Sequence, residues 1–309
     1  MKNEYKNPLV LRRADPWVYQ YNGIYYFTGS IPQYDCIELR CATSLNGLRD
    51  AKRTIVWHAH TEGEMCNHIW APELHRINDK WYIYFTAAPK HDKWAIRPHV
   101  LECADEDPIT GTWVEKGRIM LPIDSFSLDM TTFVHKGEQY IFWAQKPNED
   151  IGSCIYAAKM KNPWTLASDA VMLTAPEYDW EKQGFKVNEG PAILVHEGKV
   201  IMTYSASDTG WRYCMGMLWA DENADLLKPE SWHKSEEPVF KTCAENEMYG
   251  PGHSCFTMDG DKHVLVYHCR SYKEIDGDPL YDPNRHARAK SFTFDENGLP
   301  VFGEPVAEG

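Results

Sequence analysis

Residues 77–88 read INDKWYIYFTAA, which is a short turn at Asn78-Asp79 followed by a run of aromatic and β-branched side chains. Asn and Asp tolerate the positive φ angles that a tight hairpin turn requires. The run after the turn has the length and composition of a β-strand. The segment therefore predicts the turn and the second strand of a β-hairpin.

The same design occurs five times along the chain. In each repeat, a turn that carries Gly or Asp separates a short strand-like segment from an alternating aromatic and β-branched run. The repeats are about 60 residues long, and their turn residues are Gly23, Asp79, Gly137, Gly198 and Gly260. Further strand-like stretches follow each hairpin, so one repeat holds three or four strands.

Five such repeats predict an all-β chain folded as a five-bladed β-propeller, because radially packed sheets leave only short, protected edges. A β-sandwich is the structural alternative, but it would not return to one motif five times. The chain has no composition break or linker, so we expect a single domain over residues 1–309. The expected blades are approximately residues 13–60, 70–120, 128–175, 188–235 and 250–300.

Charge and composition limit the partners and the compartment. The chain has a formal net charge of −13 and no cluster of Lys or Arg, so nucleic acid is not an expected partner and a neutral substrate fits better. No segment has the ~20 apolar residues of a membrane span, and no signal peptide is visible. Nine scattered Cys, an odd number, favour reduced thiols. These features predict a cytoplasmic protein without membrane association, and they leave its oligomeric state open.

The first strand of each repeat opens on a polar or aromatic residue. Because the innermost strand of a blade lines the central channel, we expect five of these residues to converge on one axial pocket: Asp15, Trp70, Asp129, Glu189 and His253. Three of the five are carboxylates. Like charges in a partly dry pocket raise one another's pKa, which suits acid–base chemistry. For any single one of them, binding of channel water or capping of a turn is the structural alternative.

These openings resemble glycoside hydrolase family 43. The family pattern is an Ala-Asp-Pro motif near the N-terminus, a mid-chain Asp and a Glu-Gly-Pro motif that opens the fourth blade. Here the pattern reads Ala14-Asp15-Pro16, Leu128-Asp129 and Asn188-Glu189-Gly190-Pro191. The WAPE stretch at residues 70–73 and the GPGH stretch at residues 250–253 are also similar. The resemblance spans nearly the whole chain.

The resemblance implies an inverting glycosidase. Asp15 would be the general base that activates water, and Glu189 would be the general acid. Asp129 would orient Glu189 and raise its pKa. Inverting enzymes hold the base and the acid roughly 6.5–9.5 Å apart, which leaves room for the water. Opposite walls of a propeller channel can supply that separation.

Three further residues are assigned to substrate binding on the same resemblance. Trp70 would stack on the terminal sugar, with a core position under a loop as the alternative. Arg288 would reach the pocket from the fifth blade and hydrogen-bond sugar hydroxyls, with a surface position as the alternative. His253 would lie on the propeller axis near a cation or a water. The resemblance requires no cofactor and allows a Ca2+ ion in the channel, although one imidazole does not define a Ca2+ site.

A histidine-rich segment precedes the second expected blade. It contains His58, His60, Cys66 and His68. The spacing of these residues fits no usual zinc template. We therefore expect a loop at the rim of the pocket rather than a metal site.

Two stretches of this sequence resemble the arabinofuranosidase branch of the family: NPLVLRRADPW at residues 7–17 and YDCIELR at residues 34–40. The expected activity is release of terminal α-L-arabinofuranose from arabinan- or arabinoxylan-derived oligosaccharides. A β-xylosidase or another exo-glycosidase of the family is the alternative within this class. Two alternatives come from outside this class. A non-catalytic glycan-binding propeller would not need three crowded carboxylates, and a sugar phosphorylase would need a basic cluster in the pocket to bind phosphate.

Overall fold

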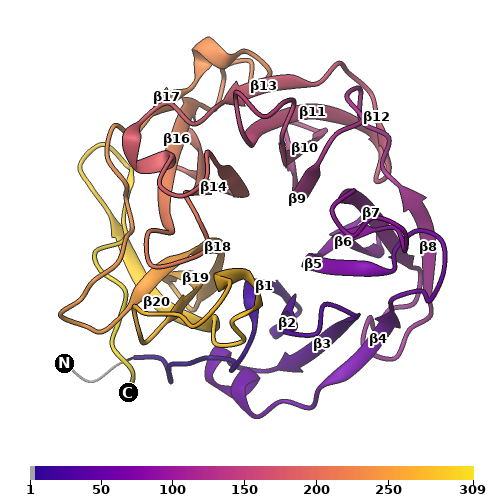
Figure 1. Ribbon diagram of the computed structural model, residues 1–309, viewed down its shortest axis with the longest axis horizontal. Helices are drawn as coiled ribbons and strands as arrows, with labels where there is room; N and C mark the ends of the chain where they lie inside the picture. The colour runs from indigo at the N-terminus through magenta and orange to yellow at the C-terminus, as the bar shows by residue number, and fades with distance from the viewer. Residues whose placement is uncertain (1–3) are drawn as a thin grey trace.

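The computed structural model describes residues 4–309, so the first three residues of the predicted domain lie outside the described part. Five antiparallel sheets stand radially around a central axis (Figure 1). The predicted all-β, five-bladed propeller is confirmed. The innermost strands are β1 (Ala14–Tyr21), β5 (Asn67–Ile77), β9 (Ser127–His135), β14 (Asn188–His196) and β18 (Tyr249–Asp259).

Each sheet uses its strands in sequence order from the axis outward, with one exception at the edge of the third sheet, where both β12 and β13 pair with β11. The remaining strands of the first two sheets are β2 (Ile24–Ser30), β3 (Cys36–Ala42), β4 (Thr54–His58), β6 (Lys80–Ala88), β7 (Arg97–Cys103) and β8 (Trp113–Arg118). Those of the third sheet are β10 (Glu138–Gln145), β11 (Cys154–Asn162), β12 (Thr165–Leu166) and β13 (Val171–Thr174). Those of the last two sheets are β15 (Lys199–Ala206), β16 (Cys214–Asp221), β17 (His233–Lys234), β19 (Lys262–Arg270), β20 (His286–Phe294) and β21 (Pro300–Val301).

Helical structure in residues 4–309 is limited to short 3-10 segments. They are η1 (Leu45–Arg49), η2 (Asp179–Glu181), η3 (Pro229–Ser231) and η4 (Pro279–Tyr281). Within the same residues no helix combines the length and the hydropathy that crossing a membrane requires.

The segment at residues 77–88 forms the turn and second strand of the β5–β6 hairpin. Ile77 pairs with Lys80, and Asn78 and Asp79 close the turn at φ angles of 48° and 61°. Two positive φ angles are type I′ geometry, whose twist matches the twist of the flanking strands. The turns at residues 22–23, 136–137 and 197–198 repeat this geometry with Gly in second place. The hairpin prediction is confirmed.

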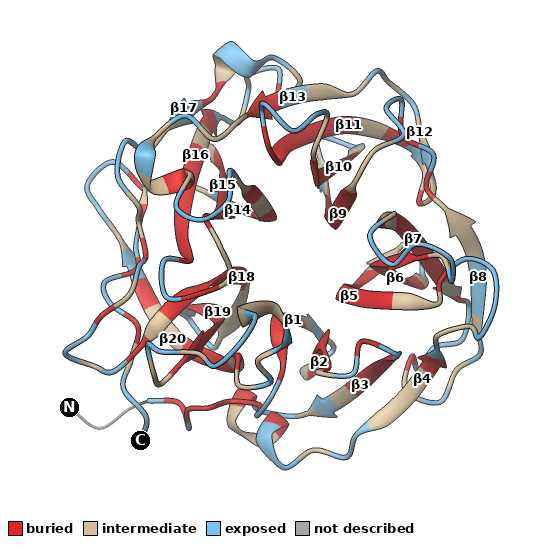
Figure 2. Cartoon of the chain, viewed as in Figure 1, coloured by how far each residue is buried: buried red, intermediate tan, exposed pale blue. Residues whose placement is uncertain are grey.

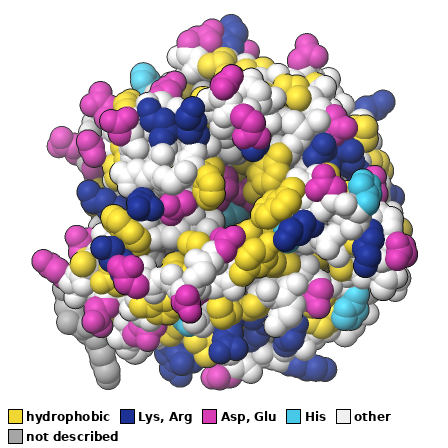
Figure 3. Space-filling model, viewed as in Figure 1, with side chains coloured by type: hydrophobic (Ala, Val, Ile, Leu, Met, Phe, Trp, Pro, Cys, Tyr) yellow, Lys and Arg dark blue, Asp and Glu magenta, His cyan; other side chains and the backbone are white. Residues whose placement is uncertain are grey.

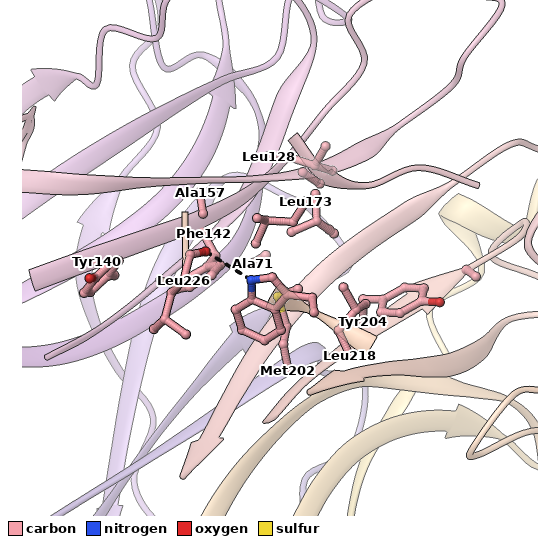
Figure 4. Packing of buried hydrophobic residues seen from close by; sticks show 14 of the residues in the cluster. Ala71, Leu128, Tyr140, Phe142, Ala157, Leu173, Met202, Tyr204, Leu218 and Leu226 are labelled. Atoms are coloured by element: carbon pink, nitrogen blue, oxygen red, sulfur yellow. Dashed lines mark hydrogen bonds between the residues drawn. The ribbon is translucent and has the colours of Figure 1, made fainter. Parts of the chain in front are cut away.

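The hydrophobic core lies between neighbouring sheets. Figure 4 shows part of the cluster between the third and fourth sheets, where Phe142 of β10 packs near Met202 of β15 and Leu218 of β16. Phe142 and Met202 are fully buried, and burying a side chain of this size contributes about 1.5–3 kcal/mol. The indole N–H of Trp232 donates to the Leu226 carbonyl at 3.0 Å in the same cluster. Figure 2 shows that the buried residues extend over the first three strands of each sheet.

The N-terminal segment joins the first sheet to the fifth. Strand β21 pairs with Thr293 and Phe294, at the end of β20. It does not cover the edge of β20 in the first half of that strand, which begins at His286. Residues 7–10 occupy this edge. The Leu9 N–H donates to the Ala287 carbonyl at 2.7 Å. The Asn7 side chain donates to the Ala289 carbonyl at 2.8 Å and accepts from the Ala289 N–H at 2.9 Å. The ring is therefore closed by hydrogen bonds immediately before β1.

We expect Asn7→Ala to lower the free energy of unfolding by about 1–3 kcal/mol, because it leaves a buried N–H and a buried carbonyl of Ala289 without partners. Denaturant-induced unfolding followed by tryptophan fluorescence measures this change. Lys6→Ala, at an exposed neighbouring position, is the control and should unfold like the parent chain. Equal free energies of unfolding for Asn7→Ala and the control would show that the hydrogen bonds between Asn7 and Ala289 do not stabilise the closed ring.

Candidate active site

One end of the channel opens into a cavity of about 1040 Å³ that all five sheets and their loops line. Figure 3 shows the hollow on this face, with hydrophobic side chains gathered around it. The structure brings five of the expected residues into the cavity wall: Asp15, Trp70, Asp129, Glu189 and His253. Convergence of residues far apart in sequence follows from the radial arrangement of the inner strands.

The backbone at the start of the inner strands turns these side chains toward the axis. The pairing register shifts next to Asp15 and again next to Glu189, as expected for β-bulges, which redirect side chains. Asp15, Asp129 and His253 have φ angles of 51°, 56° and 45°. A non-glycine residue in this left-handed region costs on the order of 1–3 kcal/mol. Such strain is common at functional sites, and here it coincides with the cavity.

Asp15 lies in a setting that favours its ionised form. The Ser30 hydroxyl donates to Asp15 Oδ2 at 2.5 Å, and the Ser30 oxygen also accepts from the Ala71 N–H at 2.8 Å. The Nδ1 atom of His253 lies 3.3 Å from Asp15 Oδ1, and Nη1 of Arg285 lies 3.7 Å from it. Burial alone would raise the pKa of Asp15, but His253, Arg285 and the other neighbours outweigh it and lower the pKa to about 2. Asp15 can therefore accept a proton at neutral pH.

Asp129 and Glu189 form a pair that tends to keep a proton. The Gly190 N–H donates to Asp129 Oδ2 at 2.9 Å, and the Tyr213 hydroxyl donates to Glu189 Oε1 at 2.6 Å. Burial and the charge of Glu189 raise the pKa of Asp129 well above its usual range. Burial, helped by the charge of Asp15, raises the pKa of Glu189 to about 7, although the bond from Tyr213 opposes the rise. The cavity thus places a protonated carboxyl near an ionised one.

Trp70 lies in the cavity wall with an aromatic cluster behind it. Its ring stacks on His68 at 4.2 Å between centroids and meets Tyr34 edge-on at 5.7 Å. Trp70 is 7% exposed, and its Nε1 has no hydrogen-bond partner among residues 4–309. Trp70 therefore lines the cavity and also packs against other aromatic rings. Its stacking on a sugar stays a prediction.

The arginine predicted from the resemblance is not at the cavity. Arg288 is fully buried within β20, and its Nη2 donates to Glu308 Oε1 at 2.6 Å. The expected pocket position of Arg288 is therefore wrong. Arg285 precedes β20 at the strand end next to the cavity, which it lines, and its Nη2 donates to the Tyr34 hydroxyl at 2.8 Å. Both arginines belong to one short stretch, and only the pairing of β20 distinguishes them.

Two other contributors were not found from the sequence. Tyr213 is the last residue of the β15–β16 loop and donates to Glu189, and Ser30 ends β2 and donates to Asp15. Neither lies in a motif, and their types are common in strands. Sequence spacing carries no signal for either residue, because their roles depend on which strand ends meet at the cavity.

The histidine-rich segment is not one loop. His58 ends β4 and His68 lies in β5, while His60 lies between them and pairs with Glu115 at 2.8 Å. The expectation of a single loop is therefore wrong for His58 and His68, which lie in strands. Nowhere in residues 4–309 do three His, Cys, Asp or Glu side chains group so that they could hold a metal ion.

A Ca2+ ion beside His253 stays a prediction of the family resemblance. Its Nδ1 faces Asp15 Oδ1 at 3.3 Å and Asp129 Oδ2 at 3.9 Å. Ca2+ takes six to eight oxygen ligands, and the two carboxylates nearest to His253 accept hydrogen bonds from Ser30 and Gly190. A Cβ at residue 190 would lie 3.1 Å from the His253 ring, so Gly190 allows the close packing of this histidine.

The sequence profile described as glycosyl hydrolases family 43 matches residues 5–300. The chain belongs to glycosyl hydrolase family 43. It is 51% identical over 309 residues to a Streptomyces avermitilis protein named extracellular exo-alpha-(1->5)-L-arabinofuranosidase, covering 99% of this chain and 64% of that relative. A Streptomyces chartreusis protein of the same name is 51% identical over 279 residues, 89% of this chain and 85% of the relative. The crystal structure of an alpha-L-arabinofuranosidase from Lactobacillus brevis matches with a TM-score of 0.96 and 48% identity, over 99% and 98% of the two chains.

These relatives correct the expected compartment. Two family 43 proteins at 51% identity are named extracellular, which contradicts the prediction of a cytoplasmic protein. The cysteine argument fails for a physical reason. Seven of the nine thiols, such as Cys154 and Cys214, are buried, and burial raises the pKa of both to about 12. Unreactive buried thiols carry little information about the redox state of a compartment.

Proposed function

We propose that this family 43 chain is an exo-acting α-L-arabinofuranosidase that removes terminal arabinofuranose from neutral arabino-oligosaccharides with inversion. The observation that carries the proposal is one cavity that holds a carboxyl group with a pKa of about 2, Asp15, and another with a pKa of about 7, Glu189. Two carboxyl groups whose environments separate their pKa values are the acid and base of glycoside hydrolysis. The names of the relatives support arabinofuranose as the sugar.

In the proposed mechanism, one proton leaves the attacking water and another reaches the glycosidic oxygen. The Asp15 carboxylate accepts a proton from water as the water oxygen attacks the anomeric carbon. Glu189 gives its proton to the glycosidic oxygen as the bond to the leaving sugar breaks. Burial and the charge of Asp15 keep the pKa of Glu189 high. Asp129, which accepts from the Gly190 N–H, is assigned the role of orienting Glu189. Proton exchange with solvent then restores both groups.

The direct test is hydrolysis of a panel of aryl glycosides and oligosaccharides. We expect turnover of an aryl α-L-arabinofuranoside and of linear arabino-oligosaccharides, and little turnover of a β-D-xyloside. Proton NMR of the first-formed arabinose should show the anomer opposite to that of the substrate. Asp15→Asn should abolish turnover, because an amide cannot accept the proton. Preference for the xyloside would favour the β-xylosidase alternative, and binding without cleavage would favour a glycan-binding propeller.

Glu189→Gln should lose activity in proportion to the need of the leaving group for a proton. We expect a loss of about 10²–10⁴-fold on oligosaccharides and a much smaller loss on a dinitrophenyl glycoside, whose leaving group departs without protonation. Asp129→Asn should behave similarly but more mildly. Comparison of kcat/KM on the two substrates measures the effect. Equal losses on both would remove Glu189 as the acid.

Tyr213→Phe should move the alkaline limb of activity to higher pH. In the parent chain kcat/KM should fall below pH 2, where Asp15 protonates, and above about pH 7, where Glu189 loses its proton. The Tyr213 hydroxyl stabilises the Glu189 carboxylate and lowers its pKa, so its removal raises that pKa. A pH profile on an oligosaccharide checks this, and an alkaline limb that stays in place or moves down would contradict it.

A further inference from the structure

A buried histidine stands between the proposed base and the proposed acid. Strand β18 of the fifth sheet packs against β1 of the first sheet and against β14 of the fourth, so the fifth sheet lies between those two in the ring (Figure 1). Asp15 belongs to β1 and Glu189 to β14. His268 lies in β19, the second strand of the fifth sheet, and is 1% exposed. It therefore lies in the sheet that both carboxyl groups flank.

On the Asp15 side, His268 accepts a hydrogen bond from the backbone. The Asp15 N–H donates to His268 Nδ1 at 3.0 Å, and Asp15 Oδ1 lies 3.5 Å from the same nitrogen. Asp15 has a φ angle of 51°, a left-handed conformation that persists only where the surrounding structure holds it. The bond to His268 occupies the N–H of this strained residue and so helps to set where its carboxylate points.

On the Glu189 side, His268 supports the ring of Tyr213. The two rings lie nearly parallel, with 5.5 Å between their centroids and 9° between their planes, an arrangement typical of offset stacking. Tyr213 immediately precedes β16 of the fourth sheet, and its hydroxyl donates to Glu189 Oε1 at 2.6 Å. One residue, Tyr213, therefore separates His268 from the proposed acid.

The inner strand of the fifth sheet leaves room for this stack. Gly252 of β18 pairs with His268 in the register of the sheet. A Cβ at residue 252 would lie 2.5 Å from Cε1 and 2.6 Å from Cδ1 of Tyr213, whereas nonbonded carbon atoms prefer about 3.5–4.0 Å. A side chain at this position would push the tyrosine ring away, so the glycine permits the contact between Tyr213 and His268.

We propose that His268 is a positioning residue that holds the proposed base and the proposed acid at their working separation. It acts on Asp15 through the backbone N–H and on Glu189 through the Tyr213 ring. The proposal rests on the proposed glycosidase function and deepens it. Inversion requires roughly 6.5–9.5 Å between the two carboxyl groups, and a displacement of about 1 Å can cost about 10²-fold in rate. A residue in contact with the supports of both groups fixes that separation.

Two substitutions separate the two contacts. His268→Phe keeps a ring beside Tyr213 and removes the acceptor for the Asp15 N–H, whereas His268→Asn supplies an amide oxygen as acceptor and removes the ring. The measurement is kcat/KM per folded enzyme on an arabino-oligosaccharide and on a dinitrophenyl α-L-arabinofuranoside. His268→Phe should lose about tenfold or more, equally on both substrates, because both need attack by water. His268→Asn should lose about tenfold more on the oligosaccharide than on the aryl glycoside, because only the sugar leaving group needs the proton of Glu189.

Gly252→Ala tests the Tyr213 contact without changing His268. The added methyl group must displace the Tyr213 ring, so the loss should again be about tenfold larger on the oligosaccharide. This variant gives the answer if the His268 variants do not fold. As matched controls, His233→Phe and His233→Asn make the same changes at an exposed position of the outermost strand β17 and should equal the parent chain on both substrates.

Two results would overturn the proposal. One is a loss that is the same on both substrates in His268→Asn and in Gly252→Ala, which is what a merely structural role would give. The other is full activity of both His268 variants. A parent chain inactive on the dinitrophenyl arabinofuranoside would instead refute the proposed function.

Discussion

Three carboxyl groups, the guanidinium of Arg285 and the imidazole of His253 share one buried cavity, and electrostatic repulsion limits how many of those carboxyls can be ionised together. Arg285, Ser30 and two histidines stabilise the negative charge on Asp15, so the proton that the site retains lies on the pair formed by Asp129 and Glu189. The surrounding sheets hold these groups close together and so keep the ionisation of the three carboxyl groups unequal. Without the radial sheets, these groups would separate and each would ionise in water.

The division of charge depends on the integrity of the whole ring. Asp15 opens β1, and the segment immediately before β1 is the one that closes the propeller onto β20 through Asn7 and Leu9. Arg285 immediately precedes β20 on the other side of this junction. Asp15 and its cationic neighbour Arg285 therefore lie at the starts of the two strands that ring closure brings together. Stability at the junction and the ionisation of Asp15 are physically linked.

Local features of the sequence were sufficient for the fold and for the carboxylates. Turn residues such as Asn78 and Asp79 act through backbone preference, and a repeat of about 60 residues places the openings of the inner strands at one axis. Arg285 could not be distinguished from Arg288 in this way, because pairing register decides which arginine faces the cavity. Tyr213 and Ser30 were missed because their partners come from other strands. The compartment was predicted wrongly because thiol count says nothing about thiol burial.

The tight turns between the first two strands of each sheet lie at the end of the propeller away from the cavity, whereas the β6–β7, β15–β16 and β19–β20 loops lie at the cavity end. Two-residue type I′ turns tolerate no change in length without a change in strand register. Loops at the cavity end have no such restriction, since both of their flanking strands are already fixed from the far end. The molecule thus separates turns whose length is fixed by strand register from loops whose length is free to change. Substrate preference in such a propeller can diversify by loop replacement while Glu189 and Asp15, the proposed acid and base, keep the positions that the strands give them.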